Sequence, residues 1–421
     1  MNNLVVSKTK DFLMLDGKKF FYLADTVWMG FCRMTIDEWK SYLAYRKEQG
    51  FNVLQLVLVP ATFDTTMSSD TICPFKRTST GDFDYKNINN EFFDKALLMS
   101  KIAIQAGFIL NIAPSWSNII PGTWSSKLAS ESTIPLNLYR DYISYVVDFF
   151  SEINPIYMTA GDTDMNYAST IEYYHEELRI IKEKSPESIT TLHTEPHTFL
   201  PDEIIRNPNL DFYLYQSCHM IEDQANSYKF AQGLYHAEVK RPNGEPCYEG
   251  MGWFKKYGRF TAFDVRKAMW QSILSGAKAG FTYGAHGVWN WQRNSDEFFG
   301  EGNWMVSMEG NAAVKLPGAW DVGYGKQLFE KYDMFDLEPS EKILNKTPEI
   351  RMSVSRDEKK IVIYVPYNTN VEVDMDLTGY EFELIKMAER EVVKPKVEIS
   401  NGRSIIGMID YYGDVLIIGR R

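Results

Sequence analysis

Four acidic side chains stand at or just beyond the ends of short apolar segments: Asp25, Asp162, Glu245 and Glu249. Two carboxyl groups can cleave a glycosidic bond, because one protonates the leaving oxygen while the other acts as nucleophile or activates water. We therefore take Asp162, Glu245 and Glu249 as candidate catalytic residues. For Asp25 we expect a hydrogen bond to a substrate hydroxyl, or a supporting role as an acceptor.

Aromatic and uncharged polar side chains occur at the same places. Aromatic rings can stack on the apolar faces of sugars, and Gln and His can hydrogen-bond sugar hydroxyls. The candidate substrate-binding residues are Asp25, Trp28, Gln55, Trp116, His193, Gln216, His219, Tyr283, His286, Trp289 and Trp291. Each Trp could equally belong to the core, and each His could be a buried partner of a carboxylate.

These residues need a scaffold, and the sequence alternates between short apolar segments and segments with helical spacing. The expected strands are 20–23, 51–59, 108–113, 156–159, 189–192, 212–215, 242–248 and 280–284. The expected helices are 35–50, 91–106, 138–152, 171–184, 201–206, 228–238, 263–277 and 325–332. The first helix has the clearest signals, because Thr35 and Glu38 form a capping box and Gly50 suits its end.

Eight strand–helix units favour a closed (β/α)8 TIM barrel, which leaves no free sheet edge. A doubly wound open sheet is the alternative, but the turn Leu23–Trp28 has no GxGxxG pattern. We assign residues 1–337 to the barrel. Active-site residues of such barrels lie at the carboxyl ends of the strands, where the candidates above stand.

The pattern changes beyond residue 337 to short alternating apolar segments separated by turn residues. Asn401-Gly402 and Tyr412-Gly413-Asp414 are expected to form hairpin turns. We therefore assign residues 338–421 to a small all-β sandwich. We expect it to cover apolar surface on the flank of the barrel, and Arg266 to be an ion-pair anchor.

The net charge and the composition of the chain argue against several classes of binding partner. The formal net charge is −11 in 421 residues, which disfavours a nucleic acid or an anionic membrane. Positive charge is scarce at the expected strand ends, so a phosphorylated substrate is disfavoured too. We expect an oligosaccharide or polysaccharide as partner. The first residues show no signal-peptide pattern, so we expect a cytoplasmic location, although a secreted protein that has lost its signal peptide would have the same sequence.

Metal and cofactor motifs are absent from the sequence. The four cysteines form no CxxC pair. His193-Thr-Glu-Pro-His197 resembles HExxH, but Glu195 is one position late and Pro196 disfavours the required helix. No H-x-H follows the first strand, which speaks against a metal-dependent barrel hydrolase. We expect neither a metal nor a cofactor.

Seven motifs occur in an order that is similar to one known family. They are Phe21-Tyr-Leu-Ala-Asp-Thr-Val-Trp28, Gly50-Phe-Asn-Val-Leu-Gln55, Ala160-Gly-Asp162, Tyr215-Gln-Ser-Cys-His219, Asn243-Gly-Glu-Pro-Cys-Tyr-Glu249, Asp264-Val-Arg266 and Gly280-Phe-Thr-Tyr-Gly-Ala-His286. Together they resemble the apiosidase-like glycoside hydrolases, family 140 and its relatives. The resemblance covers essentially the whole chain and implies a (β/α)8 barrel followed by a β-sandwich of the type called collagen-binding, a name that does not make collagen the ligand here.

The resemblance also implies an acidic pair, an Asp after the fourth strand and a Glu after the seventh. Asp162 matches the first. Glu245 and Glu249 both fit the second motif, and Glu245 is favoured because a Glu after a small residue at a strand end resembles the nucleophile position of related barrel glycosidases. Two departures, Tyr157 and Trp116-Ser117 where family members commonly have Trp and Trp-Gly, concern the walls of the pocket.

The expected function is hydrolysis of a plant or microbial cell-wall glycan, such as an apiose-containing side chain of pectin, with retention of configuration. Asp162 would be the general acid/base, with a pKa raised by burial and by a neighbouring carboxylate. A helix cap is the alternative role for Asp162. The alternative function is a carbohydrate-binding barrel protein with weak or no hydrolase activity.

Overall fold

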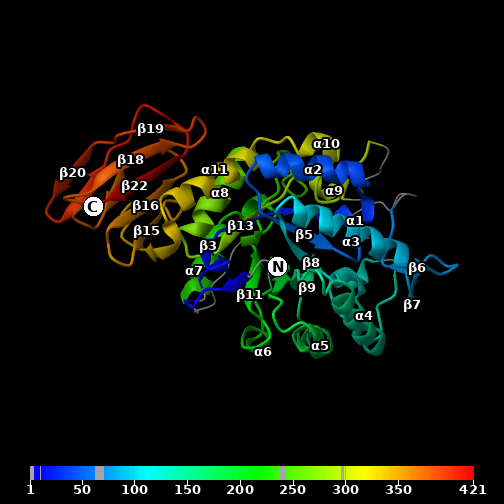
Figure 1. The fold of residues 1–421 in the computed structure, drawn as a ribbon. Coiled ribbons are helices and arrows are strands. Elements are labelled where there is room, and N and C mark those ends of the chain that lie inside the picture. The colour runs from blue at the N-terminus through cyan, green and yellow to red at the C-terminus, as the bar shows by residue number, and fades with distance from the viewer. Residues whose placement is uncertain are drawn as a thin grey trace.

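A computed structural model describes residues 4–9, 11–61, 71–129, 131–196, 198–236, 243–294, 298 and 300–421. Its centre is a closed barrel with strand order β10-β11-β12-β13-β4-β5-β8-β9 (Figure 1). The strands are β4 Tyr22–Thr26, β5 Val53–Val57, β8 Ile109–Ala113, β9 Ile156–Thr163, β10 Thr190–Thr194, β11 Phe212–Gln216, β12 Asn243–Glu245 and β13 Gly280–Tyr283. Neighbouring strands are parallel, and the pairing of β13 with β4 closes the ring. The predicted (β/α)8 barrel is confirmed.

Helices surround this barrel on its outer side (Figure 1). They are α1 Gly30–Arg33, α2 Ile36–Glu48, α3 Asn90–Gln105, α4 Leu136–Phe149, α5 Ala168–Lys184, α6 Asp202–Ile205, α7 Asn226–His236, α8 Ala262–Ile273, α9 Glu301–Trp304, α10 Gly310–Ala313 and α11 Gly318–Lys331. The predicted capping box of Thr35 and Glu38 is present on α2. The last helix begins at Gly318, well before the predicted position 325. Residues 237–242, which end one predicted helix and begin one predicted strand, lie outside the described residues.

Strand alternation separates two environments along β4. Tyr22 points into the barrel, where its hydroxyl accepts hydrogen bonds from the side-chain amides of Gln55 at 3.0 Å and Asn111 at 2.9 Å. Asp25 lies on the opposite face and contacts Arg46 and Tyr42 of α2. Successive side chains of a strand point to opposite faces, so a polar residue near a strand end faces either the pocket or the helix layer.

Two short sheets flank the barrel, and neither was predicted from the sequence. One is antiparallel and comprises β1 Leu4–Val6, β2 Leu13–Leu15 and β3 Lys18–Phe20. The other is a hairpin of β6 Phe75–Arg77 and β7 Phe83–Ile88. Most of these strands have only three residues, too few for an alternating pattern to be recognised.

The C-terminal region consists of two antiparallel sheets that enclose a second apolar core. The larger has the order β14-β15-β16-β22-β18-β19 and the smaller the order β17-β21-β20. The strands are β14 Leu337–Ser340, β15 Arg351–Ser355, β16 Lys360–Val365, β17 Val371–Val373, β18 Glu381–Lys386, β19 Glu391–Val393, β20 Val397–Ser400, β21 Arg403–Ile406 and β22 Val415–Arg420. Asn401 and Gly402 form the predicted hairpin turn, both with positive φ. The second predicted hairpin is wrong, because Gly413 lies in a segment that crosses from β21 in one sheet to β22 in the other.

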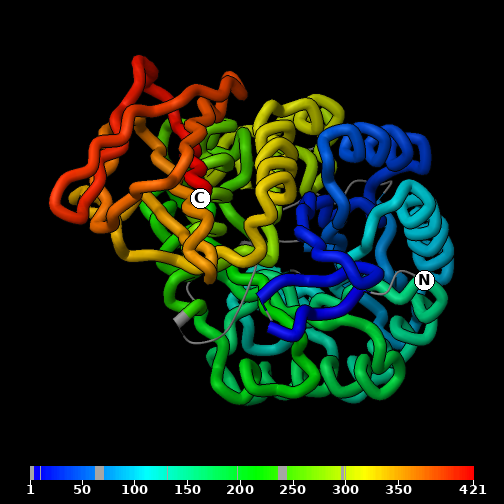
Figure 2. The backbone as a smooth tube through the Cα atoms, turned by 60° about the vertical axis from the view of Figure 1, so that its left-hand side comes forward, coloured from blue at the N-terminus to red at the C-terminus, as the bar shows by residue number. Residues whose placement is uncertain are grey.

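The C-terminal region lies against one side of the barrel (Figure 2), and the outer face of its larger sheet makes the contact. Val362, Leu416 and Ile418 belong to the same continuous apolar cluster as the barrel core. Arg266 of α8 forms an ion pair with Asp414 at 2.6 Å, and both side chains are almost completely buried. The sandwich therefore covers an apolar flank of the barrel, and Arg266 is the ion-pair anchor that the sequence predicts.

A buried carboxyl group lies in the helix layer between α4 and α5. Glu177 of α5 accepts a hydrogen bond from the hydroxyl of Tyr139 on α4 and is fully buried. Burial raises the pKa of Glu177 to about 8, although the bond from Tyr139 acts in the opposite direction. The native protein therefore holds this proton up to about pH 8, whereas an unfolded chain releases it at about pH 4.5.

We expect this difference to make stability fall as the pH rises. Between about pH 4.5 and pH 8 the native state binds more protons here than the unfolded state, which costs up to about 1.4 kcal/mol per pH unit. Glu177→Gln keeps the shape and an acceptor for Tyr139 but cannot ionise. Its free energy of unfolding, measured by urea denaturation at pH 5 and pH 8, should fall less than that of the wild type. Equal decreases in the two proteins would contradict a neutral Glu177.

Candidate active site

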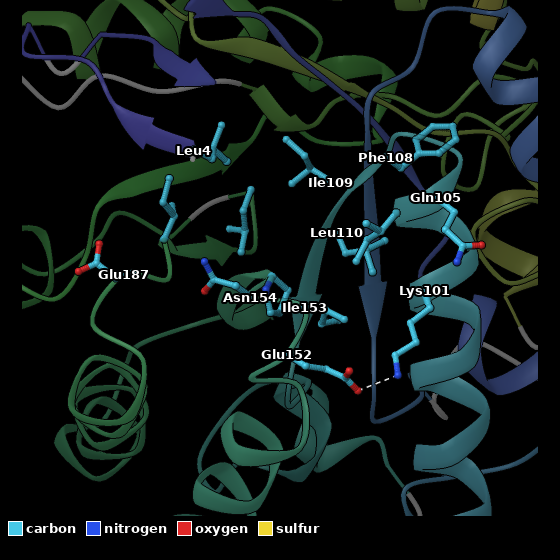
Figure 3. A pocket seen from close by; sticks show the side chains of 14 residues that line it. Leu4, Lys101, Gln105, Phe108, Ile109, Leu110, Glu152, Ile153, Asn154 and Glu187 are labelled. Carbon is cyan, nitrogen blue, oxygen red and sulfur yellow. Dashed lines mark ion pairs between the residues drawn. The ribbon is translucent and has the colours of Figure 1, made fainter. Parts of the chain in front are cut away.

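A cavity of about 460 Å³ opens at the carboxyl ends of the barrel strands. Seven of the residues predicted from the sequence line it: Trp28, Trp116, Asp162, Gln216, His219, Glu245 and Trp289. A second cavity, of about 410 Å³, lies at the opposite end of the barrel, beside Leu4 and the ion pair of Lys101 with Glu152 (Figure 3). In TIM barrels the active site lies at the carboxyl ends of the strands, whereas residues at the other end contribute to stability. We therefore take the first cavity as the candidate active site.

Glu245, at the end of β12, has polar partners at both carboxylate oxygens. The hydroxyl of Tyr248 donates a hydrogen bond to Oε1, and Nε2 of His219 lies 3.3 Å from the same atom. Nε2 of His193 lies 2.9 Å from Oε2. These contacts hold the carboxylate in one orientation at the wall of the cavity.

The same contacts determine the charge of Glu245. Burial alone would raise the pKa of this carboxyl, but His193 and His219 outweigh burial and hold the pKa well below its ordinary value. Glu245 is therefore an ionised carboxylate at neutral and mildly acidic pH. An ionised, oriented carboxylate is what a nucleophile or a base requires.

A hydrogen bond at Nδ1, the other ring nitrogen of His193, fixes the tautomer of this side chain. Nδ1 of His193 accepts a hydrogen bond of 3.0 Å from the backbone amide of Asp162. Nδ1 therefore carries no proton, and the ring proton resides on Nε2, which faces Glu245. His193 connects the backbone at one predicted catalytic residue to the side chain of another.

Asp162 stands on an irregular part of β9. Between two regular pairs with β10, the strand β9 has three residues, Ala160, Gly161 and Asp162, where β10 has only His193. Ala160 and Asp162 have φ values of 64° and 51°, in the left-handed region that non-glycine residues seldom adopt. This bulge turns the backbone amide of Asp162 toward His193 and places the half-buried side chain at the cavity.

Close packing explains why glycine occupies position 161 of the Ala-Gly-Asp motif. A Cβ atom at Gly161 would lie 2.0 Å from the ring of Trp116, which packs directly on this backbone. Trp116 in turn lies 5.1 Å from Trp28, centroid to centroid, and stacks on His193. Gly161 thus allows one aromatic wall of the cavity to form.

Asp25, Gln55 and Tyr283 do not line the cavity, so the structure does not bring them to the place where we predicted contact with substrate. The carboxylate of Asp25 is fully buried against Arg46 and Tyr42, which agrees only with its alternative role as a supporting acceptor. Gln55 lies inside the barrel below the cavity, bonded to Tyr22 and Thr282. Tyr283, like Asp25, faces the helix layer, because the two residues are paired neighbours on adjacent strands.

His286 and Trp291 are buried in the packing around the last strand rather than exposed in the cavity. Burial lowers the pKa of His286 to about 3, so the imidazole is neutral, and its ring packs edge-on against Phe298. Trp291 packs against Tyr42 of α2 and is 2% exposed. Trp291 fits the core alternative that the sequence leaves open, whereas His286 is buried without a carboxylate partner among the described residues.

Glu249 has a different environment from Glu245. Its carboxylate accepts hydrogen bonds from the hydroxyl of Tyr283 at 2.6 Å and from the backbone amide of Gly318 at 2.9 Å. Gly318 is the first residue of α11, so Glu249 satisfies a free amide at the start of that helix. Burial raises the pKa of Glu249. It does not belong to the cavity lining.

Several cavity residues are missing from the sequence-based set. Tyr248 lies between the two candidate glutamates in sequence, and its hydroxyl also accepts a hydrogen bond of 2.9 Å from Trp28. Trp124 comes from a loop and Trp304 from the short helix α9, and Trp124 donates a 2.7 Å hydrogen bond to the carbonyl of Asp162. Tyr248 could have been found, because it belongs to the same motif as Glu245. The two tryptophans carry no comparable signal.

The family of this chain follows from its similarity to known proteins. The model of the family "Apiosidase-like, catalytic domain" matches residues 7–336. The chain belongs to the apiosidase-like family. It is therefore a glycoside hydrolase, as the motifs predict. No curated protein matches the sequence.

Solved structures similar to this apiosidase-like chain include several glycoside hydrolases. One named "Glycoside hydrolase" has a TM-score of 0.80 at 18% identity, with 99% of this chain and 96% of that chain covered. A glycoside hydrolase family 5 protein from Bacteroides vulgatus has the same TM-score and identity, with 99% and 93% covered. An alpha-amylase from Lactobacillus plantarum has a TM-score of 0.55 at 11% identity, with 94% and 98% covered. At these identities the likeness shows the shared fold.

Neither a cluster of metal ligands nor a membrane-spanning helix is found in the part of the chain that the structure describes. Within the described ranges, no three His, Cys, Asp or Glu side chains come together as a metal site. His197, from the sequence that resembles HExxH, lies outside those ranges. No described helix has the length and apolar character needed to cross a membrane.

Proposed function

We propose that this apiosidase-like enzyme cleaves an apiose-containing side chain of a cell-wall glycan, with Glu245 as nucleophile and Asp162 as general acid/base. The observation that supports this most is the environment of Glu245. Its carboxylate is ionised, oriented by His193 and Tyr248, and lies in one cavity with Asp162.

In the first step, Asp162 donates a proton to the glycosidic oxygen while Glu245 attacks the anomeric carbon. The bond from carbon to the leaving oxygen breaks, and a glycosyl ester with Glu245 forms. In the second step, Asp162 removes a proton from water, which attacks the same carbon and releases Glu245. Two displacements return the original configuration, so we propose retention.

The aromatic walls suit a neutral sugar ring. Trp28, Trp116 and Trp289 line the cavity, and no Lys or Arg is found among its described lining residues. A phosphate or sulfate group on the reacting sugar would meet the carboxyl groups of Asp162, Glu195 and Glu245 and no Lys or Arg of the described lining. The reacting ring should therefore carry no such charged substituent.

The test is a screen of p-nitrophenyl glycosides, an apioside among them, together with apiose-containing oligosaccharides from pectin. We expect the apiose substrates to be hydrolysed fastest, and ¹H NMR of the first product should show the configuration of the substrate. Inverted product would overturn the role of Glu245 as nucleophile. Hydrolysis of other glycosides but not of apiosides would overturn the proposed sugar.

A further inference from the structure

The helix layer of the barrel is incomplete beside β10 and β11. The helix that follows β10, α6, is a single turn of four residues (Figure 1). A cavity of about 470 Å³ occupies this place. Its lining comes from the end of β10, the loop after it, the outer face of β11, and α7.

This cavity of about 470 Å³ beside α6 adjoins the candidate active site. Glu195, Pro196 and Gln216 line both cavities. Gln216 also connects to the catalytic group, because its Nε2 lies 3.4 Å from Nε2 of His219, which contacts Glu245. The Oε1 atom of Gln216 is buried and has no hydrogen-bond partner among the described residues, so an acceptor is available where the two cavities meet.

The walls of this cavity present aromatic rings. Phe199 is 73% exposed, unusual for so large an apolar side chain, and its ring lies edge-on to that of Phe230 at 5.6 Å. Tyr213 and Tyr215 contribute rings from β11, with both hydroxyls already engaged, by Thr194 at 2.6 Å and by the carbonyl of Ser227 at 3.1 Å. These tyrosines are only 4% and 1% exposed, so they form the closed apolar base of the cavity, and the exposed ring surface comes from Phe199.

Polar groups stand beside the rings. Lys229 on α7 and Glu195 supply a cationic donor and an anionic acceptor to the same space. Flat apolar rings bordered by a few hydrogen-bonding groups match a sugar, which has an apolar ring face and a rim of hydroxyls.

From this geometry we propose that the cavity around Phe199 and Phe230 is a second sugar-binding subsite, which holds a further ring of the glycan whose glycosidic bond lies at Glu245. The proposal rests on the proposed function for the identity of that glycan. Because the two cavities meet at Gln216 and Pro196, we expect a single oligosaccharide to occupy both.

The test compares Phe199→Ala with wild type on a short and a long substrate. On apiose-containing pectin oligosaccharides, we expect KM to rise about tenfold while kcat stays the same, since stacking of one ring contributes about 1.4 kcal/mol. p-Nitrophenyl apioside is too short to reach the cavity beside α6, so its KM and kcat should both stay unchanged. Tyr412→Ala is the control, because Tyr412 is 93% exposed on the sandwich. No effect of Phe199→Ala on the long substrate, or equal effects on both, would overturn the subsite.

A binding measurement separates this proposal from the proposed function. Calorimetric titration of Glu245→Gln and of Glu245→Gln/Phe199→Ala with the same pectin oligosaccharides needs no hydrolysis. Weaker binding of the double variant supports the subsite even if the wild type fails to cleave apiosides. Equal binding of the two variants refutes it even if the wild type is an apiosidase.

Discussion

Glu245→Gln should lower kcat/KM for apiosides by about 10³-fold or more while the protein stays folded. Gln preserves the shape of the side chain and an acceptor for Tyr248, but it cannot attack the anomeric carbon as an anion. The contacts with His193 and Tyr248 hold this group in a fixed orientation, so another side chain cannot replace it. Initial rates on p-nitrophenyl apioside, with circular dichroism to verify the fold, measure the effect.

Glu249→Gln is the matched control for this prediction. It changes the same atoms four residues away, at a carboxylate that holds Tyr283 and the start of α11. We expect its activity to remain within about threefold of wild type and its melting temperature to fall, because a buried charge-assisted hydrogen bond is weakened. A large loss of activity in Glu249→Gln with little loss in Glu245→Gln would reverse the assignment.

Azide separates the two catalytic roles. In Glu245→Gly, azide can occupy the space of the lost carboxylate and attack the sugar directly, so the glycosyl azide should have inverted configuration. In Asp162→Gly, azide should attack the covalent intermediate, and the glycosyl azide should keep the original configuration. Both products are distinguished by ¹H NMR, and a swapped result would exchange the roles of Asp162 and Glu245.

The sequence locates the strand ends correctly, but it does not tell which face a residue occupies there. Asp25, Gln55 and Tyr283 are all close to strand ends, yet Asp25 and Tyr283 point outward to α2 and Gln55 lies one layer below the cavity. Buried strands of a barrel are apolar on both faces, so no alternation marks the inner side. A shift of one residue moves a side chain from the pocket to the helix layer.

Asp162 and Gln216 both line the cavity, but for different reasons. Gln216 follows regular alternation at the end of β11. Asp162 depends on the bulge at Ala160 and Gly161, which strand alternation alone cannot predict. Its motif indicated the position, because a glycine before an Asp at a strand end marks an irregular backbone. Trp124 and Trp304 could not be predicted, since they lie in the connections between barrel elements, Trp304 on the single-turn helix α9, and their positions depend on how these connections fold.

Asp414→Asn should destabilise the protein by about 3 kcal/mol or more. The carboxylate of Asp414 accepts two hydrogen bonds from Arg266, at 2.6 and 2.7 Å, and a third from Tyr364 at 3.0 Å. Asn keeps the size of the side chain but removes the charge, so among the described residues the buried guanidinium of Arg266 retains Asp321 as its anionic partner. Because Arg266 belongs to α8 of the barrel and Asp414 to the sandwich, the loss acts on the contact between the two.

An exposed ion pair within the sandwich provides the comparison. Asp374 and Arg403 lie 3.0 Å apart with more than half of each side chain exposed. Asp374→Asn should therefore change the free energy of unfolding by about 0.5 kcal/mol or less. Urea denaturation followed by tryptophan fluorescence measures both variants, and kcat in the absence of urea should be unchanged in both. If Asp414→Asn were no more destabilising than Asp374→Asn, the buried pair would not hold the sandwich to the barrel, and the shared apolar cluster of Val362, Leu416 and Ile418 would have to do so alone.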